Sequence, residues 1–479
     1  MNPDPRRWWA LAVLATAQFM VIMDTSIIAV ALPRMQQDLG FSPSGLQWVF
    51  NGYAVAFGGL LLLGGRLSDL FGARRVFATG WLVLIAGSVL AAAATTPGVE
   101  IAGRAVQGAG AALLAPAAMT LLMVLFAGQP TELPKAMSFY GAAAPAGGTA
   151  GVFLGGVITE WLTWPWVFVI YVPIGLLTLA FTPATLPAVP GRRSSTDLAG
   201  ALAVTAGLAL AVAALVTAPA NGWTSATTLG QLAASVALIA GFLLLQRLVR
   251  APLMPLRIWR TPGLAAANIS MALLGAAWIP MWYFLNLYIQ QVLGFGSFAS
   301  GAALLPMTAL IMIGMIGVTG RLLARFGARP LIITGLLVLA AGLGLLALAD
   351  PHGSFAADVL PGSLVAAAGM ALAFIPATMT AIGGVAPAEG GLASGIVNTT
   401  YQVGSALGLA AMTAVAVANG AGQTTDPVEL TIGYTTAFTV TALVALAGAV
   451  LAALTLRRPS VHTGSTEIVP AEQRTTTSV

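Results

Sequence analysis

One acidic residue lies deep inside an apolar stretch and could carry proton chemistry. Asp24 is the only acid well inside an apolar span in the first half of the chain. It lies about 16 residues into this span, or roughly 24 Å along a helix that rises 1.5 Å per residue. Because charged residues near a bilayer centre usually serve proton or substrate passage, we expect Asp24 to bind and release a proton. The alternative is a hydrated residue near the outer end of its helix.

Glu100 and Arg104 form a second group of charges further along the chain. Residues four apart lie on one face of a helix, so the two can form an ion pair. If the pair is exposed near the outer end of the helix, it contributes only about 0.3 to 0.5 kcal/mol.

Aromatic and amide side chains form a candidate substrate surface. Trp278, Trp282 and Asn286 recur every four residues and can share one helix face. Aromatic walls with few polar groups suit amphipathic molecules, and aromatic faces hold cations. Tryptophans of a membrane-interface belt are the alternative. The other candidates are Gln18, Tyr283, Gln290, Asn398 and Gln402.

The sequence shows no motif or cluster of residues typical of a metal site, a nucleotide-binding site or an enzyme active site. With zero cysteines there is no disulfide, thiolate metal site or cysteine nucleophile. Two histidines, His352 and His462, cannot build a histidine-rich metal site, and no Gly-x4-Gly-Lys-Ser/Thr phosphate loop occurs. Clustered nucleophile or acid–base groups are not visible, so we predict no enzyme, no metal and no cofactor. We expect the energy to come from an ion gradient, and one isolated carboxylate favours protons.

The elements that must position these residues are membrane-spanning helices. Hydrophobic residues make up 58% of the 479, charged residues 7%, and the mean hydropathy is +0.91. A spanning helix needs about 20 apolar residues, and long Leu/Ala/Val runs argue against an alternating barrel. We predict an all-α polytopic membrane protein with fourteen transmembrane helices. Their approximate ranges are 8–32, 46–65, 76–95, 99–126, 136–159, 164–183, 198–219, 229–248, 263–292, 297–319, 330–349, 356–385, 391–419 and 432–456.

Basic residues predict the orientation, because cytoplasmic loops retain Lys and Arg. With the N-terminus inside, eighteen of the 20 lie on the cytoplasmic side, and only Arg34 and Arg104 lie on or towards the outside. Both termini are therefore expected in the cytoplasm. The net charge of +5 reflects this topology and gives no indication of a nucleic-acid partner. The cytoplasmic set is Arg6, Arg7, Arg66, Arg74, Arg75, Lys135, Arg192, Arg193, Arg247, Arg250, Arg257, Arg260, Arg321, Arg325, Arg329, Arg457, Arg458 and Arg474.

A short repeat divides the chain into two related halves. The segment from Gly65 to Arg75 recurs 255 positions later, from Gly320 to Pro330. Many secondary transporters are built from such repeats. The first copy joins helices 2 and 3 and the second joins helices 10 and 11, so two helices are inserted between six-helix bundles. We predict an N-terminal bundle at 1–186, linkers with two lipid-facing inserted helices at 187–261, a C-terminal bundle at 262–457, and a disordered cytoplasmic tail at 458–479.

The repeated loop also has a mechanical interpretation. Gly65 and Gly72 permit close helix approach and a tight turn. Asp69 can accept hydrogen bonds from a helix N-terminus or pair with an arginine such as Arg74 or Arg75. This would latch the two halves on the cytoplasmic side. The alternative is plain topology, because basic loops stay inside regardless.

Several segments together carry a resemblance to a known family. In this order and on this topology they are similar to the major facilitator superfamily, and within it to the fourteen-helix drug:proton antiporters. The resemblance covers nearly the whole chain before the tail. The segments are Met23 to Thr25 with Ala31 to Pro33, Gly65 to Arg75, Arg104 to Gly108, Gly151 to Gly156, Trp164 to Phe168, Val172 to Gly175, Leu287 to Gln290, Gly301 to Pro306, and Gly391 to Gly408.

The resemblance implies a function. It implies a major facilitator fold that exports amphipathic drugs or antibiotics in exchange for protons by alternating access. Multidrug efflux of this kind implies a small-molecule substrate, a proton gradient, and residence in the bacterial cell (inner) membrane; we expect a monomer. A proton-linked importer, or a dedicated exporter of one endogenous metabolite, would share the fold and stays as the alternative.

The resemblance also assigns residue roles. The aspartate matching Asp24 is linked to coupling and cation recognition, and the arginine matching Arg104 to proton transfer. We therefore hypothesise that protonation of Asp24 weakens an Asp24–Arg104 interaction and biases the outward-to-inward switch. The helix 5 segment resembles the antiporter signature through Gly147, Gly151, Gly155 and Gly156. The chain departs from the family pattern at Val152, Pro165 and Tyr401.

Overall fold

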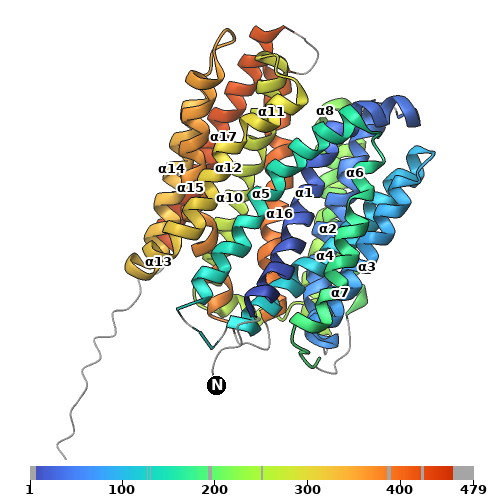
Figure 1. Cartoon of the computed structure of the whole chain (residues 1–479), viewed down its shortest axis with the longest axis vertical. Coiled ribbons are helices and arrows are strands. Elements are labelled where there is room, and N and C mark those ends of the chain that lie inside the picture. Colours follow the sequence, from blue (N-terminus) through green and yellow to red (C-terminus); the bar gives the residue numbers. More distant parts are fainter. Residues whose placement is uncertain are drawn as a thin grey trace, which may run out of the picture.

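The protein folds as a bundle of long helices (Figure 1). The computed structural model describes residues 7–41, 43–126, 128–129, 131–191, 197–249, 252–385, 390–421 and 426–456, and within these ranges no strand occurs. Arg192, Arg193 and the predicted tail lie outside the described residues. Thirteen helices in the described part are long and apolar enough to cross a membrane, so the predicted helical membrane architecture is confirmed. The fourteenth predicted span, 198–219, contains a shorter described apolar helix, Ala199–Ala211.

The first bundle contains seven helical segments, of which α6 and α7 together replace one predicted helix. They are α1 (Arg7–Leu39), α2 (Pro43–Phe71), α3 (Ala73–Ala92), α4 (Pro97–Phe126), α5 (Leu133–Trp161), α6 (Trp166–Val169) and α7 (Tyr171–Thr185). The insert follows as α8 (Leu198–Asn221), α9 (Ala226–Leu248) and the short η1 (Leu256–Arg260).

The second bundle has more interruptions, because several helices contain a π-type turn. Its segments are α10 (Leu264–Leu287), η2 (Tyr288–Val292), α11 (Ser297–Ala303), α12 (Leu305–Ile313), η3 (Gly314–Thr319), α13 (Gly320–Phe326), α14 (Ala328–Leu346), η4 (Phe355–Val359), α15 (Leu360–Gly383), α16 (Gly390–Ala416), η6 (Val417–Ala421) and α17 (Pro427–Thr455).

The two bundles repeat the same packing. In the first, α1 packs against α5 and α3 against α4; in the second, α10 packs against α16 and α14 against α15. The helices α5 and α16 also cross between the bundles, because α5 contacts α11 and α12 while α16 contacts α2. Both run through the middle of the view in Figure 1. A change in α1 or α10 can therefore reach the interface between bundles through one helix.

Glycines at matching positions allow the close contacts in both bundles. A Cβ atom on Gly87 would lie 2.5 Å from the backbone nitrogen of Gln107, and one on Gly342 would lie 2.3 Å from that of Ala366. Because side chains would collide there, only glycine lets these helices approach so closely. The matching set is Gly80, Gly87, Gly103 and Gly110 between α3 and α4, and Gly335, Gly342, Gly362 and Gly369 between α14 and α15.

The repeated loop segments also make equivalent contacts. Arg74 Nη1 donates to the backbone oxygen of Leu186 at 3.2 Å, and Arg329 Nη2 donates to that of Ala453 at 2.8 Å. Each acceptor lies at the end of the last helix of its own bundle. Gly72 and its counterpart Gly327 both have positive φ, of 90° and 78°. The sequence repeat is thus a structural repeat.

The inserted helices attach mainly to the first bundle. In α8, Thr205 donates its hydroxyl to the backbone oxygen of Gly59 in α2 at 2.9 Å, and α8 also packs on α16. Helix α9 packs on α8 and is the least buried of the candidate spans. The lipid-facing description therefore fits α9, whereas α8 lies partly between the bundles.

Buried hydrogen bonds of Asp197 and Gln246, here called the clasp, join the start of α8 to the end of α9. Asp197 accepts from the backbone nitrogen of Gly200 and from Gln246 Nε2, both at 2.7 Å. Gln246 Oε1 in turn accepts from the backbone nitrogen of Met254 at 2.8 Å. The clasp therefore ties the start of α8, the end of α9 and the first part of the following linker together.

Candidate functional site

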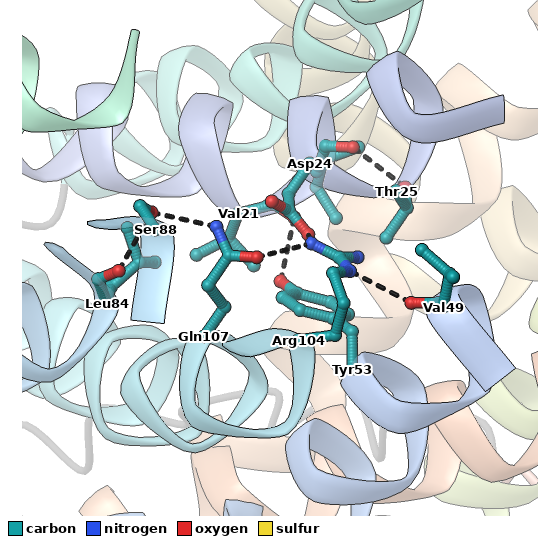
Figure 2. A network of polar contacts seen from close by, with 10 residues as sticks. Val21, Asp24, Thr25, Val49, Tyr53, Leu84, Ser88, Arg104 and Gln107 are labelled. Atoms are coloured by element: carbon teal, nitrogen blue, oxygen red, sulfur yellow. Dashed lines mark hydrogen bonds and ion pairs between the residues drawn. The ribbon is translucent and has the colours of Figure 1, made fainter. Parts of the chain in front are cut away.

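An ion pair is buried in the centre of the first bundle (Figure 2). Arg104 Nη1 of α4 donates to Asp24 Oδ2 of α1 at 2.6 Å. The side chains are 0% and 1% exposed. The expectation of an Asp24–Arg104 interaction agrees with this geometry, and the alternative of a hydrated Asp24 at a helix end is wrong.

The predicted exposed pair of Glu100 with Arg104 is also wrong. Both residues are fully buried, and the short ion pair of Arg104 is with Asp24. The two carboxylate oxygens of Glu100 and the Nη2 atom of Arg104 find no hydrogen-bond partner among the residues that the structure describes. The spacing of four predicts the shared helix face but not that this face points into the bundle.

Arg104 organises further polar contacts across three helices. Its Nε donates to the backbone oxygen of Val49 in α2 at 2.9 Å, and its Nη1 also donates to Gln107 Oε1 at 2.6 Å. Gln107 Nε2 donates to Ser88 Oγ of α3 at 2.8 Å. Figure 2 shows this chain running from Asp24 past Arg104 to Ser88. Gln107 was not predicted, although it lies only three residues after Arg104 on the same helix.

Aromatic rings enclose the guanidinium group. Arg104 Cζ lies 4.7 Å from the ring centre of Tyr53 and 5.9 Å from that of Phe168. The Tyr53 hydroxyl donates to the backbone oxygen of Val21 at 3.0 Å, and Tyr171 is buried beside Asp24. Because these rings exclude water, removing one partner of the pair leaves an uncompensated charge, which costs about 3–5 kcal/mol.

The helix 5 glycines position α1 and so Asp24. A Cβ atom on Gly147 would lie 2.3 Å from the backbone oxygen of Phe19, and one on Gly151 would lie 2.7 Å from that of Met23. Gly155 and Gly156 are buried further along the same helix. Any larger residue at the first two positions would push α1, and with it the carboxylate, away from Arg104.

The second bundle repeats these glycines without the charges. Gly404 and Gly408 of α16 approach the backbone of α10 at Ala272 and Ala276, as Gly147 and Gly151 approach α1. By this correspondence the place of Asp24 is taken by Ala277. The matching α4 and α15 glycines likewise place Ser363 where the first bundle has Arg104. The ion pair therefore belongs to one bundle only.

The predicted substrate residues divide into two groups. On α1, Gln18 accepts from the Tyr140 hydroxyl of α5 at 3.0 Å. Trp282 of α10 approaches α5, because a Cβ on Gly148 would lie 4.0 Å from Trp282 Cζ2. Gln402 of α16 lies near Gly58 of α2 at the contact between bundles. Trp282 and Gln402 therefore lie at contacts between the bundles, and Gln18 bonds to α5, which also contacts the second bundle.

The other candidates lie elsewhere on the second bundle. Trp278 is 6% exposed in the protein core, which does not fit a residue of an interface belt. Gln290 Nε2 donates to Asn286 Oδ1 and Ser300 Oγ, both at 3.1 Å. Tyr283 is 40% exposed and stands edge-on to Phe284, and Asn398 donates to its own helix at Ser394. The structure therefore does not gather all eight candidates into one surface.

The residues of the predicted latch lie at the C-terminal end of α2 and the start of α3. A Cβ on Gly72 would lie 2.3 Å from the backbone oxygen of Val189, so the loop packs on the segment after α7 of its own bundle. Across the bundles, a Cβ on Gly395 of α16 would lie 3.1 Å from the oxygen of Leu61 and 3.7 Å from Gly65 Cα. The latch residues are thus next to an inter-bundle contact.

Comparison with known proteins decides the family. The sequence model of the Major Facilitator Superfamily matches residues 14–409, with a second match at 309–477. The chain belongs to this superfamily. As a major facilitator protein it is a multi-pass membrane transporter and not an enzyme, as the sequence predicted.

Similar major facilitator proteins are named for antibiotics. The chain is 39% identical to the cephamycin export protein CmcT of Amycolatopsis lactamdurans, over 92% of this chain and 91% of that protein. It is 37% identical to the puromycin resistance protein pur8 of Streptomyces alboniger, over 99% and 96%. It is 34% identical to the tetracenomycin C resistance and export protein of Streptomyces glaucescens, over 85% of this chain and 75% of that protein.

Solved structures of other superfamily members share the fold. The human organic anion transporter MFSD10 (TETRAN) aligns with a TM-score of 0.66 at 16% identity, over 94% of this chain and 100% of that one. The transporter FucP in the outward conformation aligns with a TM-score of 0.61 at 16% identity, over 94% and 99%. At these identities the likeness establishes the architecture alone.

Proposed function

We propose that this major facilitator protein exports amphipathic antibiotics or other drugs in exchange for protons by alternating access. The similarity to export and resistance proteins over nearly the whole chain supports a drug substrate. The buried Asp24–Arg104 pair carries the proposal of proton coupling, because ionisable residues buried inside membrane bundles commonly serve as proton relays.

The proposed coupling follows from charge and packing. When Asp24 gains a proton, its ion pair with Arg104 weakens, because only the ionised carboxylate balances the guanidinium. Helix α1 then shifts, and the glycine contact at Gly147 carries the shift to α5. Because α5 packs on α11 and α12, and Thr149 bonds to Thr308 of α12, the interface between bundles responds. Rocking of one bundle against the other completes the cycle.

In this proposal the substrate lies between the bundles. Gln18, Trp282 and Gln402 supply amide groups and an aromatic face from α1, α10 and α16. The loop with Asp69 and Gly72 acts as the cytoplasmic latch. The protein works as a monomer in the bacterial inner membrane with both termini in the cytoplasm, and it needs no cofactor.

Everted membrane vesicles provide the test. The vesicles are energised, a pH-sensitive dye follows the interior, and puromycin, a β-lactam, lipophilic cations and neutral drugs are added in turn. We expect drug-dependent proton release from wild type but not from Asp24→Asn. Glu160→Gln is the matched control, because Glu160 is an exposed acid on α5 and should behave as wild type.

Three outcomes would contradict the proposal. Equal proton release from wild type and Asp24→Asn would remove Asp24 from coupling. Drug uptake that is stimulated by an inward proton gradient would indicate import. No response to any compound, with the protein shown to be present, would indicate a transporter of one narrow metabolite.

A further inference from the structure

Glu100 is a second buried carboxyl group, and it takes no part in the Asp24–Arg104 ion pair. It lies in the first turn of α4, one turn before Arg104, and is 0% exposed. Neither of its carboxylate oxygens has a hydrogen-bond partner within the described residues, and the same holds for Arg104 Nη2. Two complementary groups on one helix face are thus both unpaired.

The charges around Glu100 are few. Arg104 attracts its negative charge and Asp24 of α1 opposes it. The other titratable groups of the cluster are Tyr53 of α2 and Tyr171 of α7, while α3 contributes the neutral Ser88. Two carboxyl groups therefore share one guanidinium.

This balance fixes how many protons the cluster holds. If both carboxylates were ionised, one negative charge would be buried without compensation, which is strongly unfavourable. If Asp24 is ionised and paired with Arg104, as in the structure, then Glu100 carries the proton. One proton shared by two interacting carboxyl groups keeps the cluster neutral, and the pair titrates as a unit.

We propose that Glu100 is a second proton-binding site that alternates with Asp24 as the partner of Arg104. The proton leaves the Glu100 carboxyl and bonds to the Asp24 carboxylate, and Glu100 becomes the carboxylate that accepts from Arg104 Nη2. Arg104 stays charged and paired throughout. This inference rests on the proposed proton coupling. It describes a proton path to Asp24 along which Arg104 always has a carboxylate partner.

The position of Glu100 sets the direction of the relay. It lies near the start of α4 at Pro97, between the α3–α4 connection and the Asp24–Arg104 pair. In the proposed orientation this end of α4 faces outwards. A proton that enters from outside therefore reaches Glu100 before Asp24.

The variant Glu100→Gln tests this role, because glutamine has the shape of a protonated glutamate but cannot release the proton. We expect Glu100→Gln to keep drug binding and drug exchange, which need no net proton movement, while drug-driven proton movement falls at least about tenfold. Each 1.36 kcal/mol of lost coupling corresponds to this factor. Glu100→Asp should retain part of the proton movement, and Glu160→Gln all of it.

A spectroscopic measurement tests the proton itself. Difference infrared spectra of the detergent-solubilised protein should show the carbonyl stretch of a buried protonated carboxyl group. That band should be absent from Glu100→Gln and should persist in Asp24→Asn at low pH. A monodisperse elution profile establishes that each variant is folded.

The results separate this proposal from the proposed function. If wild type moves no protons with any drug, proton antiport fails, and the infrared band still decides whether Glu100 holds a proton. If wild type is coupled and Glu100→Gln is equally coupled, or if the band is unchanged in Glu100→Gln, the second site is overturned. Loss of drug exchange by a folded Glu100→Gln would also overturn it, because that result indicates a structural role.

Discussion

Removing Arg104 alone should destabilise the protein more than removing both partners of the ion pair together. The variant Arg104→Gln deletes the 2.6 Å contact to Asp24, the 2.9 Å bond to the backbone of Val49, and the stacking on Tyr53. Asp24 then remains buried without its partner, and breaking a buried pair in this way costs about 3–5 kcal/mol. In Arg104→Gln/Asp24→Asn no such charge remains.

The expected quantity is the coupling energy of a double-mutant cycle. The double variant should be about 2–3 kcal/mol more stable than the sum of the single effects predicts. Asp24→Asn alone should cost less than Arg104→Gln, because Glu100 can supply the missing carboxylate to Arg104. Equilibrium unfolding by sodium dodecyl sulfate in mixed micelles, followed by circular dichroism, measures the free energy of unfolding of each variant.

A more exposed ion pair provides the control. Arg7 Nη2 and Glu132 Oε2 are 2.8 Å apart, and their side chains are 11% and 31% exposed. Their cycle should give less than about 1 kcal/mol of coupling, as surface pairs do. Additive effects at Asp24 and Arg104, within about 0.5 kcal/mol, would refute the view that the cluster is dry and strongly coupled.

Three further predictions concern packing. Gly147→Val should lower the free energy of unfolding by about 1–3 kcal/mol and reduce the yield of monodisperse protein, because an added Cβ would lie 2.3 Å from a backbone oxygen of α1. The control Gly344→Ala should have neither effect, because no atom lies within 4 Å of the added Cβ. Gly72→Ala should lower the unfolding midpoint more than Gly327→Ala, because both have positive φ but only Gly72 also meets a backbone oxygen at 2.3 Å. Gln246→Leu should cost about 1–3 kcal/mol and speed proteolysis of the linker after α9, because it leaves a buried carboxylate and a backbone N–H without their partner. Equal proteolysis rates would contradict the last prediction.

The fold could be predicted because hydropathy and basic loops encode spanning helices directly. The repeat of the α3–α4 glycines in the second bundle is harder to find from the sequence than the spanning helices are. Its copies are offset by 255 residues in α3, as from Gly80 to Gly335, but by 259 in α4, as from Gly103 to Gly362. A single repeat distance misses such a pattern, because the connection between the helices differs in length.

The sequence indicates only part of the candidate site. Asp24 was identified because an acid inside an apolar span is costly to insert and is seldom present without a functional role. The environment of Glu100 was missed, since helical periodicity shows which residues share a face but not what that face contacts. The carbonyl of Val49 and the hydroxyl of Ser88 carry no sequence signal at all, because backbone acceptors and serines are common everywhere. Only three-dimensional packing brings them to Arg104 and Gln107.

The clasp at the start of α8 and the end of α9 bears on how the insert would follow the proposed rocking of the bundles. Thr205 bonds α8 to α2, and Gln246 bonds the end of α9 to Met254, so we expect these parts to move with the first bundle. At the other end Thr261 packs against Gly384 at the end of α15, so we expect it to move with the second bundle. In the proposed rocking cycle, the short helix η1 (Leu256–Arg260) lies between these two attachments, and we expect it to be one place where the connection between the bundles adjusts.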